Sequence, residues 1–167
     1  AIRSVHSGEG AEEIYLADVL WYSPEDEEAL GDAYSVDAAE NARALMEFRE
    51  EMTSGECVLM LLSPQLYREV GEGLLPLSEV FGADAARISA DGYSVRLGDT
   101  DFYSYFTAAK VLPEDTLICM RDVSKMKIYG EGKGAEADEK CRSVFRDIVN
   151  FIDPTPPDAT SADDTAD

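Results

Sequence analysis

Basic side chains are scarce in this sequence. Among its 167 residues, 35 are Asp or Glu and only 14 are Lys or Arg, which gives a net charge of −21. Nucleic acids and anionic membrane surfaces are bound through clusters of Lys and Arg. The charge therefore argues against nucleic acid as a partner and against binding to a membrane through charge. The acidic residues are spread along the whole chain, and we expect most of them to form a solvated surface.

Histidine and cysteine are also rare. His6 is the single histidine, and it lies in a predicted lead segment without a partner, which argues against Ser-His-Asp and Cys-His catalysis. The three cysteines, Cys57, Cys119 and Cys141, are far apart and form no C-x-x-C pair. Neither a disulfide framework nor a zinc site is expected, so each is predicted to be a buried apolar side chain. We expect no cofactor and no enzymatic activity.

No apolar run is long enough to span a bilayer. Residues 1–12 hold two glycines and show no apolar periodicity, so they are expected to be a flexible lead to a single α/β domain over residues 13–152. Residues 153–167 contain no large apolar side chain and are predicted to be a disordered acidic tail. The start at Ala1 is compatible with the removal of a signal or a membrane anchor upstream of it.

The clearest signals for a fold lie between residues 37 and 81. Asp37 and Glu40 have the spacing of a capping box, and Gly55 lies where a left-handed C-terminal cap is expected, so a helix is predicted between them. Residues 57–62 are apolar without interruption. Such a run is typical of a strand that is covered on both faces in a parallel sheet.

The segment that follows this strand is a candidate binding position. Ser63 and Pro64 predict the N-cap and the first residue of a second helix. In open α/β sheets, ligands bind beyond the carboxyl ends of strands, where helix N-termini offer unpaired N–H groups. Ser63, Gln65 and Tyr67 are therefore candidate ligand-binding residues. The alternative is that Ser63 only caps the helix.

Five further elements complete the predicted fold. Alternating polar and apolar residues around Asp91-Gly92 predict a β-hairpin with a two-residue turn. In chain order the elements are a first strand, an acidic connection, the hairpin, a buried strand and a C-terminal helix, over residues 14–22, 23–34, 86–97, 116–120 and 135–152. Together they predict a three-layer α/β fold, in which a mixed sheet carries helices on both faces.

An aromatic segment follows the predicted hairpin, with four aromatic side chains in the five positions 102–106. Asp99 or Thr100 can cap a helix here. The D-x-D spacing of Asp99 and Asp101 could also ligate a divalent cation, although oxygen sites normally need more than two carboxylates. Packing of these aromatic rings in the core is the default interpretation. The alternative is a binding surface, with Tyr103 and Tyr105 on the side away from the core as candidate ligand-binding residues.

Residues 47–81 resemble a known family. Their sequence, EFREEMTSGECVLMLLSPQLYREVGEGLLPLSEVF, is similar to a segment of the extracellular solute-binding proteins of bacterial ABC importers. In that segment a helix and a glycine lead into a strand, a second helix and a Pro-Leu turn. Gly55, residues 58–62, Gly73 and residues 75–79 carry the match. This chain is roughly half as long as such a protein, so the resemblance implies one lobe, and no ligand-binding residue carries over.

The resemblance implies an extracytoplasmic domain, tethered to a membrane only through a segment upstream of Ala1. We therefore expect a non-enzymatic binding or accessory domain whose partner is an unidentified small molecule or protein. Two alternatives stay open. One is an enzyme that uses carboxylates and a metal, with Asp99 and Asp101 as the first residues to test. The other is an intracellular regulatory or assembly protein in the cytoplasm.

Overall fold

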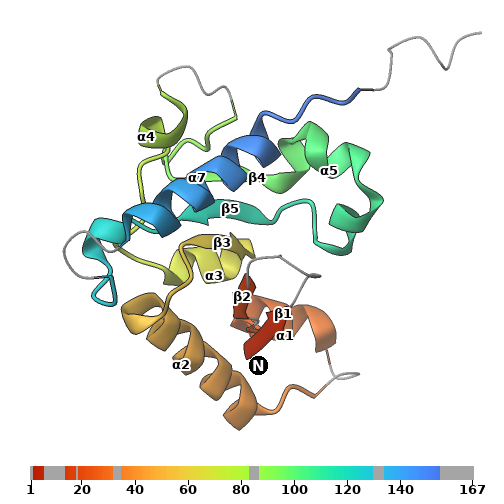
Figure 1. Ribbon diagram of the computed structural model, residues 1–167. Helices are drawn as coiled ribbons and strands as arrows, with labels where there is room; N and C mark the ends of the chain where they lie inside the picture. The colour runs from red at the N-terminus through yellow and green to blue at the C-terminus, as the bar shows by residue number, and fades with distance from the viewer. Residues whose placement is uncertain are drawn as a thin grey trace, which may run out of the picture.

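The computed structural model describes residues 2–5, 14–17, 19–31, 35–82, 87–129 and 134–154. Helices dominate it, and the strands are short (Figure 1). The helices are α1 (Pro24–Leu30), α2 (Ala38–Ser54), α3 (Pro64–Glu69), α4 (Ser78–Phe81), α5 (Asp101–Tyr105) and α7 (Ala135–Val149). The strands are β1 (Ile2–Val5), β2 (Ile14–Ala17), β3 (Leu59–Leu62), β4 (Ser94–Arg96) and β5 (Leu117–Met120).

The main sheet has three strands in the order β3-β5-β4, and both pairings are antiparallel. The pairing of β3 with β5 runs from Leu59 opposite Met120 to Leu62 opposite Leu117. The parallel pairing expected from the apolar run is therefore wrong for the described strands. An apolar run reports burial and not direction, and burial here is uneven, because Leu61 is 49% exposed.

The N-terminal strands form a separate two-stranded sheet. β1 pairs with β2 in antiparallel register, from Ile2 opposite Ala17 to Val5 opposite Ile14. The predicted lead over residues 1–12 thus contains a strand at residues 2–5, while its other residues, His6 included, lie outside the described part. The first predicted strand is confirmed over residues 14–17, although it belongs to this small sheet and not to the main one.

Helix α1 lies within the segment predicted as an acidic connection. It opens with a capping box, in which the Ser23 hydroxyl accepts from the Asp26 N–H at 3.1 Å and the Asp26 carboxylate accepts from the Ser23 N–H at 2.9 Å. Pro24 occupies the first helical position. No residue of α1 is buried, and its sequence shows no apolar periodicity that would indicate a helix. Only the residues at its N-terminal end, Ser23 and Pro24, indicate that a helix begins here.

Helix α2 begins as predicted and ends differently. The Asp37 carboxylate accepts from the N–H groups of Ala39 and Glu40. At the other end, Gly55 has a φ of −79°, so the expected left-handed cap is wrong. The carbonyl groups at this end are bound by a side chain from another part of the chain instead.

That side chain belongs to Arg121, the residue directly after β5. Arg121 is only 4% exposed. Its guanidinium donates to the carbonyl oxygens of Glu51 at 2.9 Å and Met52 at 2.7 Å, and also to those of Gly55 and Cys57 at 3.3 Å. The last carbonyls of a helix lack intrahelical partners and carry partial negative charge. Arg121 therefore supplies both the donors and the charge that the end of α2 requires, and it ties α2 to the central strand.

The chain reversal predicted near residues 86–97 is confirmed in part. Ile88 and Val95 form an antiparallel bridge, and the Ser89 N–H donates to the Ser94 carbonyl. The loop between Ser89 and Ser94 is longer than the two-residue turn expected at Asp91-Gly92. Gly92 has a φ of 82°, a conformation that glycine adopts without steric cost. Residues 83–86 lie outside the described part.

Two hydrophobic clusters meet at the sheet. Consecutive β5 residues alternate between them, as the pleat of a strand requires. One cluster contains Ile118 and Met120 of β5 with Phe145 and Val149 of α7. The other contains Cys119 of β5, Met60 and Leu62 of β3, Phe48 of α2 and Leu66 of α3. In Figure 1, α7 runs across β4 and β5, while α2 lies on the far side of β3. The predicted C-terminal helix is confirmed, although it ends at Val149.

The cysteines are free thiols of unequal burial. Full burial is confirmed for Cys119, where desolvation raises the pKa of the thiol to about 12. Cys57 and Cys141 are only partly buried, so the expectation of complete burial is wrong for these two. Cys119 is accordingly a protonated, unreactive core residue at neutral pH.

Candidate functional site

Of the residues predicted to bind a ligand, Ser63 and Gln65 make contacts within the fold. The Ser63 hydroxyl accepts from the Leu66 N–H at 3.2 Å, which caps α3. The Gln65 amide donates to the Asp26 carboxylate at 3.3 Å and so links α3 to α1. The cap interpretation of Ser63, which the sequence left open, therefore accounts for its geometry.

Replacing Ser63 with alanine is expected to lower the free energy of unfolding by about 1 kcal/mol, because the Leu66 N–H loses its capping partner. Urea unfolding followed by circular dichroism measures this change. Ser143→Ala is the matched control, since Ser143 is an exposed residue within α7 and alanine favours helix there. An equal loss in both variants would show that the cap contributes nothing.

Tyr67 joins α3 to the loop between Ser89 and Ser94. Its hydroxyl donates to the Asp91 carboxylate at 2.7 Å, and the same carboxylate accepts from the Ser89 hydroxyl and from the Tyr93 N–H. Burial and the neighbouring Asp91 raise the pKa of the Tyr67 phenol, so the phenol stays protonated. Tyr67 thus serves as a tether between two segments.

The pKa of Asp91 gives this tether a pH dependence. Burial raises that pKa, but the hydrogen bonds from Ser89, Tyr93 and Tyr67 outweigh it and hold the pKa below its usual value of 3.8. The folded state therefore favours the carboxylate, which stabilises it above about pH 4, and the contribution is lost as the pH falls through the folded-state pKa.

We expect Asp91→Asn to be less stable than the unmodified chain at about pH 7 and the difference to shrink below about pH 4. Urea unfolding of both proteins across this range measures it. Asp115→Asn, at an exposed turn position, is the control. A stability difference for Asp91→Asn that does not change with pH would contradict the assigned role.

The two predicted binding tyrosines lie in different environments. Tyr103 packs against the core cluster of Phe145 and donates to the Leu112 carbonyl at 2.9 Å, so its expected orientation away from the core is wrong. Tyr105 is exposed, as expected. Its ring lies 4.9 Å from that of Phe106 and 5.3 Å from that of Phe151, measured between ring centres.

The two aspartates proposed for a metal each lie beside an arginine. Asp99 is 3.7 Å from the Arg96 guanidinium, and Asp101 is 3.3 Å from that of Arg87. Thr100, and not Asp99, caps α5. Across the residues that the structure describes, no group of three or more His, Cys, Asp or Glu side chains is placed to hold a metal ion. These contacts do not support a metal-dependent reaction at Asp99 and Asp101.

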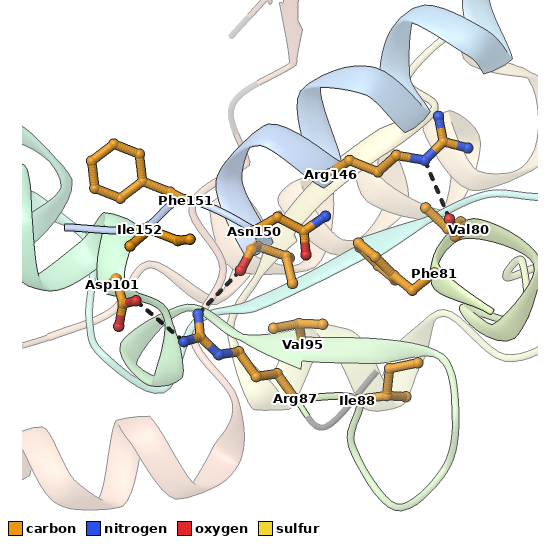
Figure 2. Close-up of a pocket in the computed structure, with 11 residues that line it drawn as sticks. Val80, Phe81, Arg87, Ile88, Val95, Asp101, Arg146, Asn150, Phe151 and Ile152 are labelled. Carbon is orange, nitrogen blue, oxygen red and sulfur yellow. Dashed lines mark hydrogen bonds and ion pairs between the residues drawn. The ribbon is translucent and has the colours of Figure 1, made fainter. Parts of the chain in front are cut away.

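A groove of about 510 Å³ lies between α4, β4, the start of α5 and the end of α7 (Figure 2). Its polar side chains are Arg87, Asp101, Arg146 and Asn150. The rest of its lining is apolar: Val80, Phe81, Ile88, Val95, Val149, Phe151 and Ile152. Pockets that bury small molecules have this size and this ratio of apolar to polar side chains.

Arg87 lies at the centre of the groove (Figure 2). Its guanidinium donates to the Val149 carbonyl at 3.1 Å and pairs with the Asp101 carboxylate at 3.3 Å. The Val149 carbonyl belongs to the C-terminal end of α7, where positive charge is favourable. Arg87 therefore holds the ends of α5 and α7 together, with both members of its ion pair partly exposed to solvent.

Arg146 lies at the other end of the groove, on α7. Its Nε donates to the Val80 carbonyl at 3.2 Å, and its Nη1 pairs with the exposed Glu139 at 3.4 Å. Figure 2 shows the first contact as a link from α7 to α4. The groove thus carries two guanidinium groups and one carboxylate.

An aromatic cluster continues the groove on one side. It consists of Phe102, Tyr105, Phe106 and Phe151, and the centres of the rings that contact one another are 4.7 to 6.0 Å apart. Tyr105, Phe106 and the adjacent Ile152 are exposed. Because Phe151 belongs to both, the cluster and the groove form one continuous surface. Two residues singled out by the sequence lie on it: Tyr105 as a ligand-binding residue and Asp101 as a metal ligand.

A second cavity, of about 420 Å³, lies between residues 19–22 and the first half of α2. Asn41, one of its lining residues, exchanges hydrogen bonds with the backbone N–H and carbonyl of Tyr22, both at 2.8 Å. Its charged lining is mainly acidic, with Asp37, Glu40 and Glu47 beside one arginine, Arg43. These are surface residues of a helix start, and the cavity has no cluster comparable to that of the first groove.

Within the described ranges, no helix is both long enough and apolar enough to cross a membrane. No protein-family model, no curated protein and no solved structure matches this chain.

Proposed function

We propose that this protein is a non-enzymatic binding domain, and that the groove between α4, β4, α5 and α7 is its ligand site. The observation that carries the proposal is the groove itself, a volume of about 510 Å³ with apolar walls and an Arg87–Asp101 pair at its centre. Apolar walls with a few convergent polar groups suit retention of a ligand. The two arginines there are held by hydrogen bonds to backbone carbonyls and by ion pairs.

We infer further that the domain acts outside the cytoplasm as a binding or accessory module, with one lobe-like body built in three layers. Helical residues packed on both faces of β5 support the layered arrangement. The similarity of residues 47–81 to solute-binding proteins supports the location. Protease treatment of intact cells that make the full-length protein tests the location. Digestion without lysis is the expected result, and protection until lysis would contradict it.

A thermal-shift screen of the whole 167-residue chain tests the binding function. The compounds are sugars, amino acids, short peptides, small organic acids, amines and divalent metals. A ligand that binds only the folded state raises the midpoint of unfolding, so one class should shift it by several degrees.

Two variants connect such a shift to the groove. Ile152 is 79% exposed at the groove wall, and Val111 is 83% exposed outside it. Neither truncation removes a buried side chain, so both Ile152→Ala and Val111→Ala should fold as the unmodified chain does. We expect only Ile152→Ala to weaken the ligand-induced shift. A screen without any shift, or equal shifts in both variants, would overturn the assignment of the groove.

A further inference from the structure

We propose that the groove binds a small amphipathic acid, a compound in which a carboxylate is attached to an aromatic or branched apolar group. This inference rests on the proposed binding function and adds the chemical class of the ligand. It follows from three features of the groove: its local charge, the exchangeable contacts of its arginines and its apolar walls.

The charged side chains that line the groove differ in balance from those of the whole chain. The chain has 35 acidic and 14 basic residues, yet the groove is lined by two arginines and one aspartate. A ligand inside it meets these side chains at close range, whereas charges elsewhere on the surface are screened over about 8 Å at physiological salt. Glu139 outside the lining also pairs with Arg146 at 3.4 Å, so an anionic group gains attraction by replacing Glu139 or Asp101 as the partner of an arginine.

The arginines can exchange their present partners for a ligand carboxylate. The ion pairs Arg87–Asp101 and Arg146–Glu139 have N···O distances of 3.3 and 3.4 Å, and both are accessible to solvent. Exposed ion pairs of this kind contribute little to stability. A guanidinium offers five N–H donors and matches a carboxylate in a two-point contact. The bonds from Arg87 to the Val149 carbonyl and from Arg146 to the Val80 carbonyl hold each side chain in place during the exchange.

The remaining walls fit an apolar group of moderate size. Phe81, Val95 and Ile88 lie on the side of the groove that carries Arg87, and Phe151 and Ile152 lie across from it (Figure 2). An aromatic ring between these side chains would bury its faces while its carboxylate reaches Arg87. The volume of about 510 Å³ is the scale of one small molecule rather than of a folded partner.

A series of three probes with the same ring tests the inference: 2-naphthylacetate, 2-naphthylacetamide and 2-(2-naphthyl)ethylamine. Binding to the full chain is measured by calorimetry and located by ¹H–¹⁵N correlation spectra. We expect the acid to bind about tenfold more tightly than the amide, the difference for one charge-assisted hydrogen bond, and the amine to bind most weakly. Amide signals of Val80, Asp101 and Phe151 should move, while that of Asn41, at the second cavity, should not.

Variants assign the preference for the acid to the arginines. Arg87→Gln and Arg146→Gln are each expected to reduce the affinity for the acid severalfold and to leave that for the amide within about twofold. Arg87→Lys should retain part of the preference, because it retains the charge. Arg96→Gln is the control, since Arg96 is an exposed arginine outside the groove that pairs with Glu114.

Four results would overturn the inference: no binding of any probe, equal affinities of acid and amide, tightest binding of the amine, or signal changes confined to other regions. The probe comparison on the unmodified chain decides the matter even if a variant does not fold. The proposed binding function would fail separately, by the absence of any shift in the thermal screen. A shift with sugars or metals alone would preserve that function and reject the acid.

Discussion

Replacing Arg121 with methionine is expected to lower the free energy of unfolding by about 3–5 kcal/mol, the range for removing one partner from a buried charged network. Methionine fills much of the same volume but donates no hydrogen bond. The Met52 carbonyl would then lose its guanidinium donor, and the Glu51 carbonyl would retain only the Gly55 N–H at 2.8 Å. The nearby Glu51 carboxylate would lose its 3.9 Å neighbour.

Urea unfolding followed by circular dichroism measures this loss. Arg96→Met is the matched control, because Arg96 pairs only with exposed carboxylates and such pairs contribute about 0–1 kcal/mol. If Arg121→Met proved as stable as Arg96→Met, the end of α2 would have to be satisfied without the guanidinium. The role of Arg121 in linking α2 to the central strand β5 would then be contradicted.

Phe145→Ala is the second substitution with a large expected effect, also about 3–5 kcal/mol. Phe145 is fully buried, at 0% exposure, and its ring meets that of Phe81 edge to face at 5.2 Å. The substitution removes the largest fully buried side chain, which α7 packs against the sheet, and leaves a cavity next to Ile118 and Met120.

The neighbouring Val144 supplies the control for this site. It belongs to the same helix turn but is 48% exposed, so Val144→Ala should change stability by only about 0.5 kcal/mol. Calorimetric or urea unfolding distinguishes the two variants. Similar losses in both would mean that α7 contributes through helix propensity and not through the packing of Phe145.

The elements that the sequence predicts correctly are those with end signals or apolar periodicity. Asp37 indicates the start of α2, and Ser63 and Pro64 indicate the start of α3. The apolar run over residues 117–120 correctly predicts β5, the central buried strand. Helix α1 is not predicted although Ser23 and Pro24 repeat the end signal of Ser63 and Pro64, because no apolar periodicity accompanies that signal in a helix that buries no side chain. The antiparallel direction of β3 could not be read from its own residues, since pairing direction depends on the route taken by the chain between strands.

The groove could not be predicted because its residues share no local pattern. Arg87, Asp101 and Arg146 come from three segments that only the packing of α7 brings together. Of the predicted site residues, Tyr105 borders this surface and Asp101 lines it. Aromatic composition indicates Tyr105, whereas the D-x-D spacing indicates Asp101 as a metal ligand and not as the partner of Arg87. A rule for parallel sheets predicts a binding position at Ser63, Gln65 and Tyr67. This rule does not apply here, because the described strand pairs are antiparallel.

The position of β5 between β3 and β4 has a consequence for the synthesis of the chain. Residues 117–120 complete the sheet, so during translation β3 and β4 leave the ribosome before their shared partner exists. At 5–20 residues per second, β3 waits roughly 3–12 s for β5. Throughout that interval Leu59–Leu62, which has no charged residue, is an unpaired hydrophobic segment, and a chaperone that shields nascent chains is expected to be needed most at this stage.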